Sequence, residues 1–103
     1  MANVKYRFTP THPGEVLKDE IAYRGISQRE LANRMGMSYK VLNDLLNGRR
    51  SLTATTAMMF EAALDVPSES LMRLQLKYNM QLARNDKPLM ERLKQIRKYA
   101  ALL

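Results

Sequence analysis

The stretch from Ser27 to Gly48 constrains the fold more than any other part of the chain, because it contains two short amphipathic segments that meet at a glycine. Ser27 is a favourable helix N-cap, and Glu30, three residues later, completes a capping box. The first segment ends at Gly36, which tolerates positive φ. Ser38 begins a second segment, in which apolar residues recur every three or four positions. The pattern predicts two helices joined by a tight turn.

The segments on either side also have helical spacing. His12 and Pro13 mark a helix start, since proline suits the first helical position, and Gly25 ends that helix. Thr53 is a favourable cap for a fourth helix, and Asp86 precedes the last one. The expected helices cover about residues 13–24, 27–35, 38–47, 54–65, 68–84 and 88–101. Because no segment has the pattern of a strand, the predicted fold class is all-α.

Three parts follow from these punctuation points. We expect an irregular N-terminal arm at residues 1–11, a helical domain at residues 12–84 and a basic amphipathic helix at residues 85–103. The core candidates of the fourth helix are Ala57, Met58, Phe60, Ala63 and Leu64. Those of the fifth helix are Leu71, Leu74, Tyr78 and Leu82, with Met72 and Gln75 beside them.

Composition limits the class of protein. The chain has no Cys and one His, so a disulfide framework, a Cys-based zinc site and a histidine cluster are excluded, and we expect no metal and no cofactor. The sequence lacks the apolar run of a signal peptide or a membrane span, which favours the cytoplasm and argues against a membrane partner. Seventeen Lys and Arg against ten Asp and Glu give a net charge of +7. A small basic domain of this kind usually has a polyanionic partner, most often nucleic acid.

The second helix of the central pair has the two faces that a groove-reading helix needs. An apolar stripe holds it on the domain, while polar side chains cover its other side, an arrangement typical of a helix-turn-helix. Its amino end and Asp44 are the candidate base readers, although Asp44 could instead orient Lys40 four residues earlier. The other candidates would contact phosphates. The complete candidate DNA-binding set is Gln28, Ser38, Tyr39, Lys40, Asn43, Asp44, Asn47, Arg49 and Arg50.

Several features have simpler interpretations. A capped helix pair also occurs in domains that never touch DNA, and the basic faces could bind an acidic protein instead. His12 is better explained as a turn residue or N-cap than as a catalyst, since no acid, base and nucleophile come together. We therefore expect that the chain is not an enzyme. The basic last helix is more typical of a packing or dimer helix than of a second DNA contact.

Several motifs resemble one family in particular. They are the His12-Pro13-Gly14-Glu15-Val16-Leu17 opening, the Ser27–Ala32 helix start, the Asn47-Gly48-Arg49-Arg50 loop, Leu52-Thr53 with Thr56-Ala57, and Leu74-Gln75 with Tyr78. Together they resemble the HigA-type antitoxins, a branch of the Xre/Cro-like helix-turn-helix family. The resemblance covers about residues 12–84, so the tail from Asp86 onward lies beyond it.

The resemblance implies a five-helix, lambda-repressor-like domain to which one C-terminal helix is added. It also implies an antitoxin that neutralises a RelE-like endoribonuclease toxin and, as a homodimer, represses its own operon by binding operator DNA. It assigns the DNA-facing role to the candidate set above, Asn43 excepted, and it carries no toxin-contacting residue over. The alternative is a stand-alone Xre-family repressor that has no toxin partner.

Overall fold

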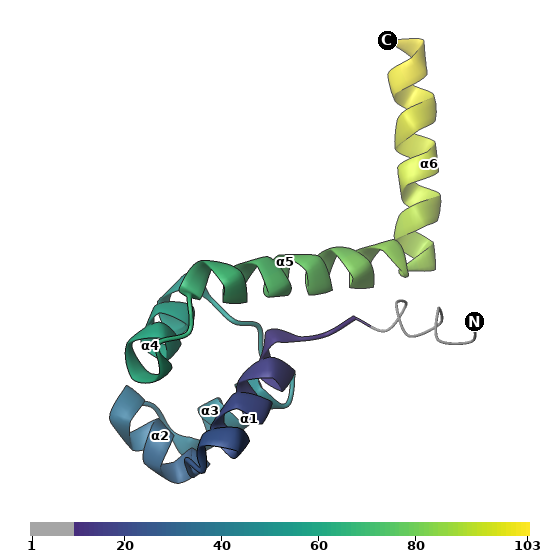
Figure 1. The fold of residues 1–103 in the computed structure, drawn as a ribbon. Coiled ribbons are helices and arrows are strands. Elements are labelled where there is room, and N and C mark those ends of the chain that lie inside the picture. The colour runs from purple at the N-terminus through teal and green to yellow at the C-terminus, as the bar shows by residue number, and fades with distance from the viewer. Residues whose placement is uncertain (1–9) are drawn as a thin grey trace, which may run out of the picture. The chain divides into compact units, whose positions relative to one another are not determined.

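The computed structural model describes residues 10–103, and these residues form six α-helices and no strand (Figure 1). The helices are α1 (Pro13–Arg24), α2 (Gln28–Met35), α3 (Tyr39–Leu46), α4 (Ala54–Leu64), α5 (Ser68–Arg84) and α6 (Lys87–Leu102). The all-α class is confirmed, and the helices lie where the sequence pattern predicts them. Residues 1–9 of the expected N-terminal arm lie outside the described residues.

Polar side chains begin the helices, as the sequence suggests. The N-caps of α1 to α4 are His12, Ser27, Ser38 and Thr53. Only half of the expected capping box of α2 forms. The Glu30 amide donates to Ser27 Oγ at 3.1 Å, but the Glu30 carboxylate accepts from Arg34 at 3.1 Å instead of reaching back to Ser27. Gly36 has φ +66° and ends α2, which the turn to α3 requires.

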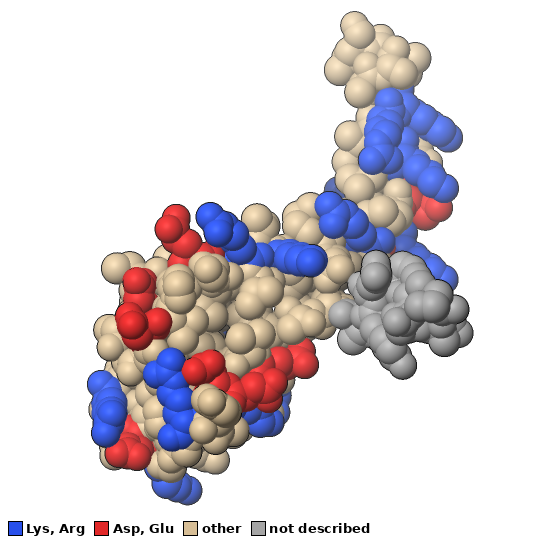
Figure 2. Space-filling view, viewed as in Figure 1, with Lys and Arg blue, Asp and Glu red and all other residues tan. Residues whose placement is uncertain are grey.

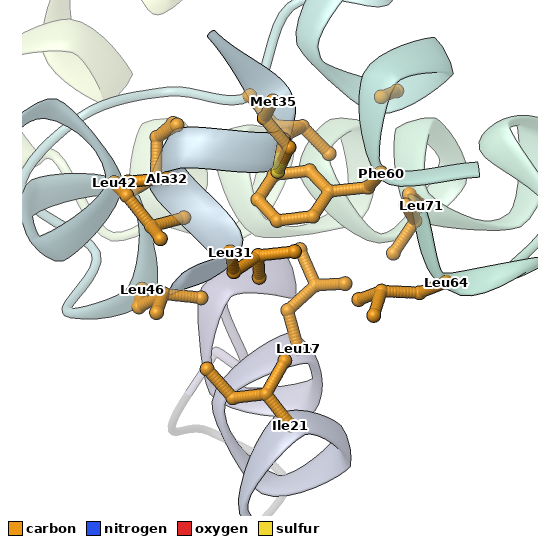
Figure 3. Packing of buried hydrophobic residues seen from close by; sticks show 13 residues of the cluster. Leu17, Ile21, Leu31, Ala32, Met35, Leu42, Leu46, Phe60, Leu64 and Leu71 are labelled. Atoms are coloured by element: carbon orange, nitrogen blue, oxygen red, sulfur yellow. The ribbon is translucent and has the colours of Figure 1, made fainter. Parts of the chain in front are cut away.

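One apolar core joins α1, α2, α3 and α4 with the first turn of α5. Figure 3 shows side chains from these helices converging on a common interior. α3 packs against both α1 and α2, and α2 also packs against α4. Each large side chain that is fully buried contributes about 1.5–3 kcal/mol relative to exposure. The core residues are Leu17, Ile21, Leu31, Ala32, Met35, Leu42, Leu45, Leu46, Leu52, Ala57, Phe60, Leu64 and Leu71.

Two core predictions were wrong. Met58 is 64% exposed, because α4 turns Ala57 and Phe60 inward and leaves Met58 on its outer side. Leu82 is 47% exposed, since it lies on the part of α5 that extends beyond the core. Leu74 and Tyr78 are only half-buried. Helical spacing gives the angle of a side chain around its helix, but it does not say how far the neighbouring helices reach.

The start of α1 is packed against the end of α3. Gly14 is buried, and a Cβ at this position would overlap the carbonyl oxygen of Leu45. The Gly14 amide donates to His12 Nδ1 at 2.9 Å, and the Glu15 carboxylate accepts from the His12 amide at 3.2 Å, which completes a capping box. The His-Pro-Gly-Glu motif therefore combines an N-cap, a first-turn proline and a residue small enough for the helices to meet.

His12 is a buried structural residue, in agreement with the N-cap interpretation. Its ring also hydrogen bonds to the backbone of Arg50. Because Nδ1 accepts from Gly14, the neutral ring carries its proton on Nε2, which can then donate to a carbonyl oxygen. Burial lowers the pKa of His12, while the Arg50 hydrogen bond and the Glu15 carboxylate act in the opposite direction. His12 thereby links the start of α1 to the loop after α3.

Gln75 explains why a polar residue belongs in the predicted Leu-Gln element. Its side chain is only 3% exposed, and Oε1 accepts from the Leu52 amide at 2.7 Å. Leu52 lies in the loop between α3 and α4, and its own side chain is buried. The hydrogen bond therefore ties α5 to the segment that leads away from α3 and satisfies a buried amide.

The chain divides into two compact units. One unit is residues 11–76, which contain α1 to α4, the first part of α5 and the whole apolar core. The other includes residues 77–103, with the end of α5 and α6. α6 begins at the N-cap Asp86, whose carboxylate accepts from the Leu89 amide at 3.1 Å, and none of its residues is buried.

Candidate nucleic-acid interface

α3 presents a polar face to solvent and is fixed on the domain by its other side. Leu42, Leu45 and Leu46 are each at most 1% exposed and hold the helix in the core. The predicted reading residues project from the opposite side. Tyr39 and Lys40 are exposed there, and Asn43 and Asp44 are half-buried. α3 is therefore a helix with a rigid attachment and a free polar surface, as the sequence predicted.

Asn43 connects three separate elements at this surface. Its Nδ2 donates to Gln28 Oε1 at 3.0 Å, which links α3 to the first residue of α2. Its Oδ1 accepts from Arg49 Nη2 at 2.8 Å, which links α3 to the following loop. One amide thus uses both of its polar ends to fix the position of a long glutamine and a long arginine side chain. Both of these residues belong to the predicted DNA-binding set.

Asp44 binds two cations at once. Lys40 Nζ donates to Oδ2 at 3.2 Å, and Arg49 Nε donates to Oδ1 at 3.1 Å. The Asp44 side chain is only 14% exposed, whereas that of Lys40 is 82% exposed. The hydrogen bond from Lys40, followed by that from Arg49, lowers the pKa of Asp44. Since both carboxylate oxygens are engaged, this geometry favours the orienting role of Asp44 over direct base reading.

The amino end of α3 adds a hydroxyl and an aromatic ring. Ser38 Oγ caps the helix by accepting from the Val41 amide at 3.1 Å. The Tyr39 ring is exposed and lies under the guanidinium of Arg29, with Arg29 Cζ 4.6 Å from the ring centroid. Such a cation–π contact restrains both side chains. Sequence reasoning missed Arg29, because nothing in its local pattern indicates that it meets a residue ten positions later.

The carboxyl end of α3 brings a residue of α1 to the same surface. Asn47 is the C-cap of α3, and its Nδ2 donates to the Asn43 carbonyl at 2.8 Å. Its Oδ1 accepts from Lys18 Nζ at 2.8 Å. Sequence reasoning missed Lys18 as well, since its contact depends on the packing of α1 against α3. Arg50 is exposed, and its backbone is held by His12.

This surface can bind an anion-rich partner but has no machinery for covalent chemistry. It carries five exposed cations, from α1, α2, α3 and the following loop, and Asp44 is the one acid in the contacts described above. Within residues 10–103 no three His, Cys, Asp or Glu side chains are placed to hold a metal ion. The same part of the chain contains no helix of the length and apolarity needed to cross a bilayer. The five cations are Lys18, Arg29, Lys40, Arg49 and Arg50.

Comparison with known proteins gives the family. Residues 21–71 match the Helix-turn-helix family. Virulence-associated protein I of Dichelobacter nodosus is 30% identical over 77 residues, which are 74% of this chain and 71% of the relative. The solved structure of antitoxin HigA of Pseudomonas aeruginosa with the higBA promoter has a TM-score of 0.72 and 31% identity, and the match covers 84% of this chain and 90% of that one.

A second solved structure of Pseudomonas aeruginosa is a protein in complex with its operator DNA, with a TM-score of 0.67 and 32% identity. That match covers 72% of this chain and 81% of the other. The matched regions include the capped α2 and α3 pair and its surroundings. The chain therefore belongs to the Xre-like helix-turn-helix family, in the branch of the HigA-type antitoxins.

Proposed function

We propose that the chain is the antitoxin of a type II toxin–antitoxin module, which neutralises a RelE-like endoribonuclease and represses its own operon as a homodimer bound to operator DNA. As a member of its family it is a regulatory, non-enzymatic protein. The observation that carries the DNA-binding half of the proposal is the ordered polar surface of α3. Its side chains are already held in place before any ligand binds.

The chemistry of this surface fits a DNA duplex. Lys40 lies at the amino end of α3, the part of a recognition helix that contacts base edges, and lysine can donate to guanine O6 and N7. Gln28, Arg49 and Arg50 fit contacts to phosphate oxygens, which fix the orientation and the register. Because Gln28 and Arg49 are both tied to Asn43, phosphate contacts would position α3 in the groove with little loss of side-chain freedom.

The relatives support the same function. The HigA structure contains a promoter, and the other Pseudomonas aeruginosa protein is bound to its operator. The proposal of a RelE-like toxin rests on the resemblance of the chain to HigA-type antitoxins. A two-fold dimer would place two copies of α3 about 34 Å apart, one turn of DNA, so the operator should contain an inverted repeat with that spacing.

An electrophoretic mobility shift assay tests the DNA-binding half. The full chain should bind the DNA upstream of its own gene more tightly than scrambled DNA of equal length. Lys40→Ala should lower the affinity for the operator much more than that for scrambled DNA, because it removes a base contact. Arg50→Ala should weaken both equally and lower the salt dependence by about 0.9 per phosphate contact. Equal affinity of the wild-type chain for both DNAs would refute the repressor role.

Co-purification tests the antitoxin half. The product of the neighbouring gene, expressed with a tag beside the full chain, should retain the chain on an affinity column and stop cleaving RNA when the chain is bound. If the chain binds its operator but neither holds nor inhibits that product, it is a stand-alone repressor. If it inhibits the product but binds no DNA even at low salt, the module regulates its operon in another way.

A further inference from the structure

The positive charge of the chain is distributed very unevenly between its parts. Residues 11–86, which include the whole helix-turn-helix, contain ten Lys and Arg against nine Asp and Glu. Residues 87–103 contain five Lys and Arg against one Glu. More than half of the net charge of +7 therefore lies on α6. The part of the chain that would read the sequence is almost neutral.

Most cations of α6 are available to a partner. Lys94 Nζ lies 3.4 Å from Glu91 Oε2, the one ion pair of this helix. The other four cations are exposed, and none of them forms an ion pair with any described residue. Figure 2 shows blue side chains gathered along α6, where only a small red area interrupts them. The four cations are Lys87, Arg92, Arg97 and Lys98.

The cations also share a side of the helix. Lys87, Lys94 and Lys98 are spaced seven and four residues apart, so they form one stripe along α6, and Arg97 borders it. Leu89, Leu93, Ile96 and Ala100 form the opposite stripe. A helix of this length extends over about 24 Å. The repeated spacing presents a row of charges rather than a single charged point.

We propose that α6 is a second DNA contact, which binds phosphates of the duplex without reading its sequence. This proposal rests on the proposed repressor function. Sequence-independent affinity grows with the number of phosphates that a protein neutralises. An almost neutral helix-turn-helix unit gains little from this source, whereas α6 offers four unpaired cations. Duplex DNA carries one charge per roughly 1.7 Å of its axis, so a row of cations of this length meets phosphates in any sequence.

An anionic membrane is the less suitable partner. A helix that lies in a bilayer surface buries its apolar stripe in lipid. In α6 two residues of that stripe, Leu89 and Leu93, are already half-buried in the protein, while Ile96 is 53% exposed. The cationic side remains fully open. The surface that is free to act is therefore the charged one, and it matches a phosphate backbone.

The test compares two double variants of the full chain in fluorescence anisotropy titrations over a range of salt concentrations. Arg97→Gln with Lys98→Gln removes two unpaired cations of α6. Arg24→Gln with Arg34→Gln is the matched control, because it removes the same charge from two exposed arginines that are paired with Glu20 and Glu30. Operator DNA and scrambled DNA are titrated with each protein, and circular dichroism checks that all three are equally folded.

We expect the α6 variant to lower the slope of log K against log salt by about 1.8 per bound protomer, that is 0.9 for each of two phosphates. Near 0.15 M salt this corresponds to roughly 30-fold weaker binding of both DNAs, with an unchanged ratio between them. The control variant should keep the wild-type slope. If both variants lower the slope equally, net charge alone acts and α6 is no contact.

The remaining outcomes separate this inference from the proposed function. A wild-type chain that does not prefer its operator refutes the repressor function. A wild-type chain that does prefer it, together with an α6 variant of unchanged slope, refutes only the role of α6. Loss of operator preference in the α6 variant would mean that α6 reads bases, which also contradicts the proposal. Loss of co-sedimentation with phosphatidylglycerol vesicles at an unchanged DNA slope would assign the surface to a membrane.

Discussion

Gly14→Ala tests whether the contact between α1 and α3 depends on the absence of a side chain. Gly14 lies in the first turn of α1 without positive φ, so alanine fits its backbone conformation. On helix propensity alone the substitution should stabilise the chain by about 0.5–1 kcal/mol. The structure predicts the opposite sign. The new Cβ would overlap the Leu45 carbonyl oxygen and would lie 3.0 Å from both His12 Nδ1 and the Leu46 carbonyl carbon.

The magnitude follows from what must move. Two of the three obstructing atoms belong to the backbone of α3 and cannot rotate away, so α1 and α3 must separate. Overpacking of this kind costs typically 1–3 kcal/mol. The shift also strains the 2.9 Å hydrogen bond from the Gly14 amide to His12, worth about 1 kcal/mol. After the propensity gain is subtracted, we expect a net loss of about 2 kcal/mol, or roughly 10 °C in Tm.

Thermal unfolding followed by circular dichroism, together with urea titration, measures this loss. Gly25→Ala is the matched control, because Gly25 has φ +70° but nothing lies within 4 Å of its added Cβ. It should cost only the strain of a left-handed alanine, about 1–2 kcal/mol. It should also leave operator binding intact, whereas Gly14→Ala should weaken operator binding because α3 is displaced. A Gly14→Ala chain as stable as the wild type would refute the close-contact explanation.

Three further predictions concern buried and paired polar groups. Gln75→Leu should destabilise the chain by about 1–3 kcal/mol in urea titrations, since the buried Leu52 amide loses its acceptor; an unchanged midpoint would show that the bond contributes nothing. Because burial lowers the pKa of His12, the folded state binds fewer protons than the unfolded state, so stability is complete above pH 6.5 and declines as the pH falls from 6.5 towards the lowered pKa. Tm measured between pH 7.5 and 5 should show this decline, and His12→Asn should flatten it; an equal decline in both proteins would mean that other groups cause it. Asp44→Ala should lower the preference for operator over scrambled DNA in anisotropy titrations, because Lys40 loses its anchor, while affinity for scrambled DNA rises with the removed negative charge; a changed preference at a single base pair would instead show that Asp44 reads a base.

Local rules account for most of what could be predicted from the sequence. A cap, the three- and four-residue spacing of apolar side chains and a terminal glycine are properties of neighbouring residues, so α2 and α3 were located correctly from residues 27–48 alone. The polar face of α3 follows from the same spacing. The roles of Lys40, Arg50 and the other DNA-binding candidates remain predictions, which the proposed variants test.

Contacts between residues far apart in the chain could not be predicted in this way. Lys18 reaches Asn47 across 29 positions, and Gln75 reaches Leu52 across 23. Met58 had the spacing of a core residue and yet lies outside, because no neighbouring helix covers that side of α4. Each outcome depends on where helices meet, and a one-dimensional pattern does not contain that information.

The sequence by itself determined that this chain is helical, where its helices begin and end, and which side of α3 faces solvent. Those properties depend on hydrogen bonding and side-chain periodicity within a few residues. Only the tertiary structure decided that Gly14 must lack a side chain, that Asp44 holds two cations and that the charges of α6 remain unpaired. The physical reason is that overlap, pairing and burial are set by the packing of whole helices against one another.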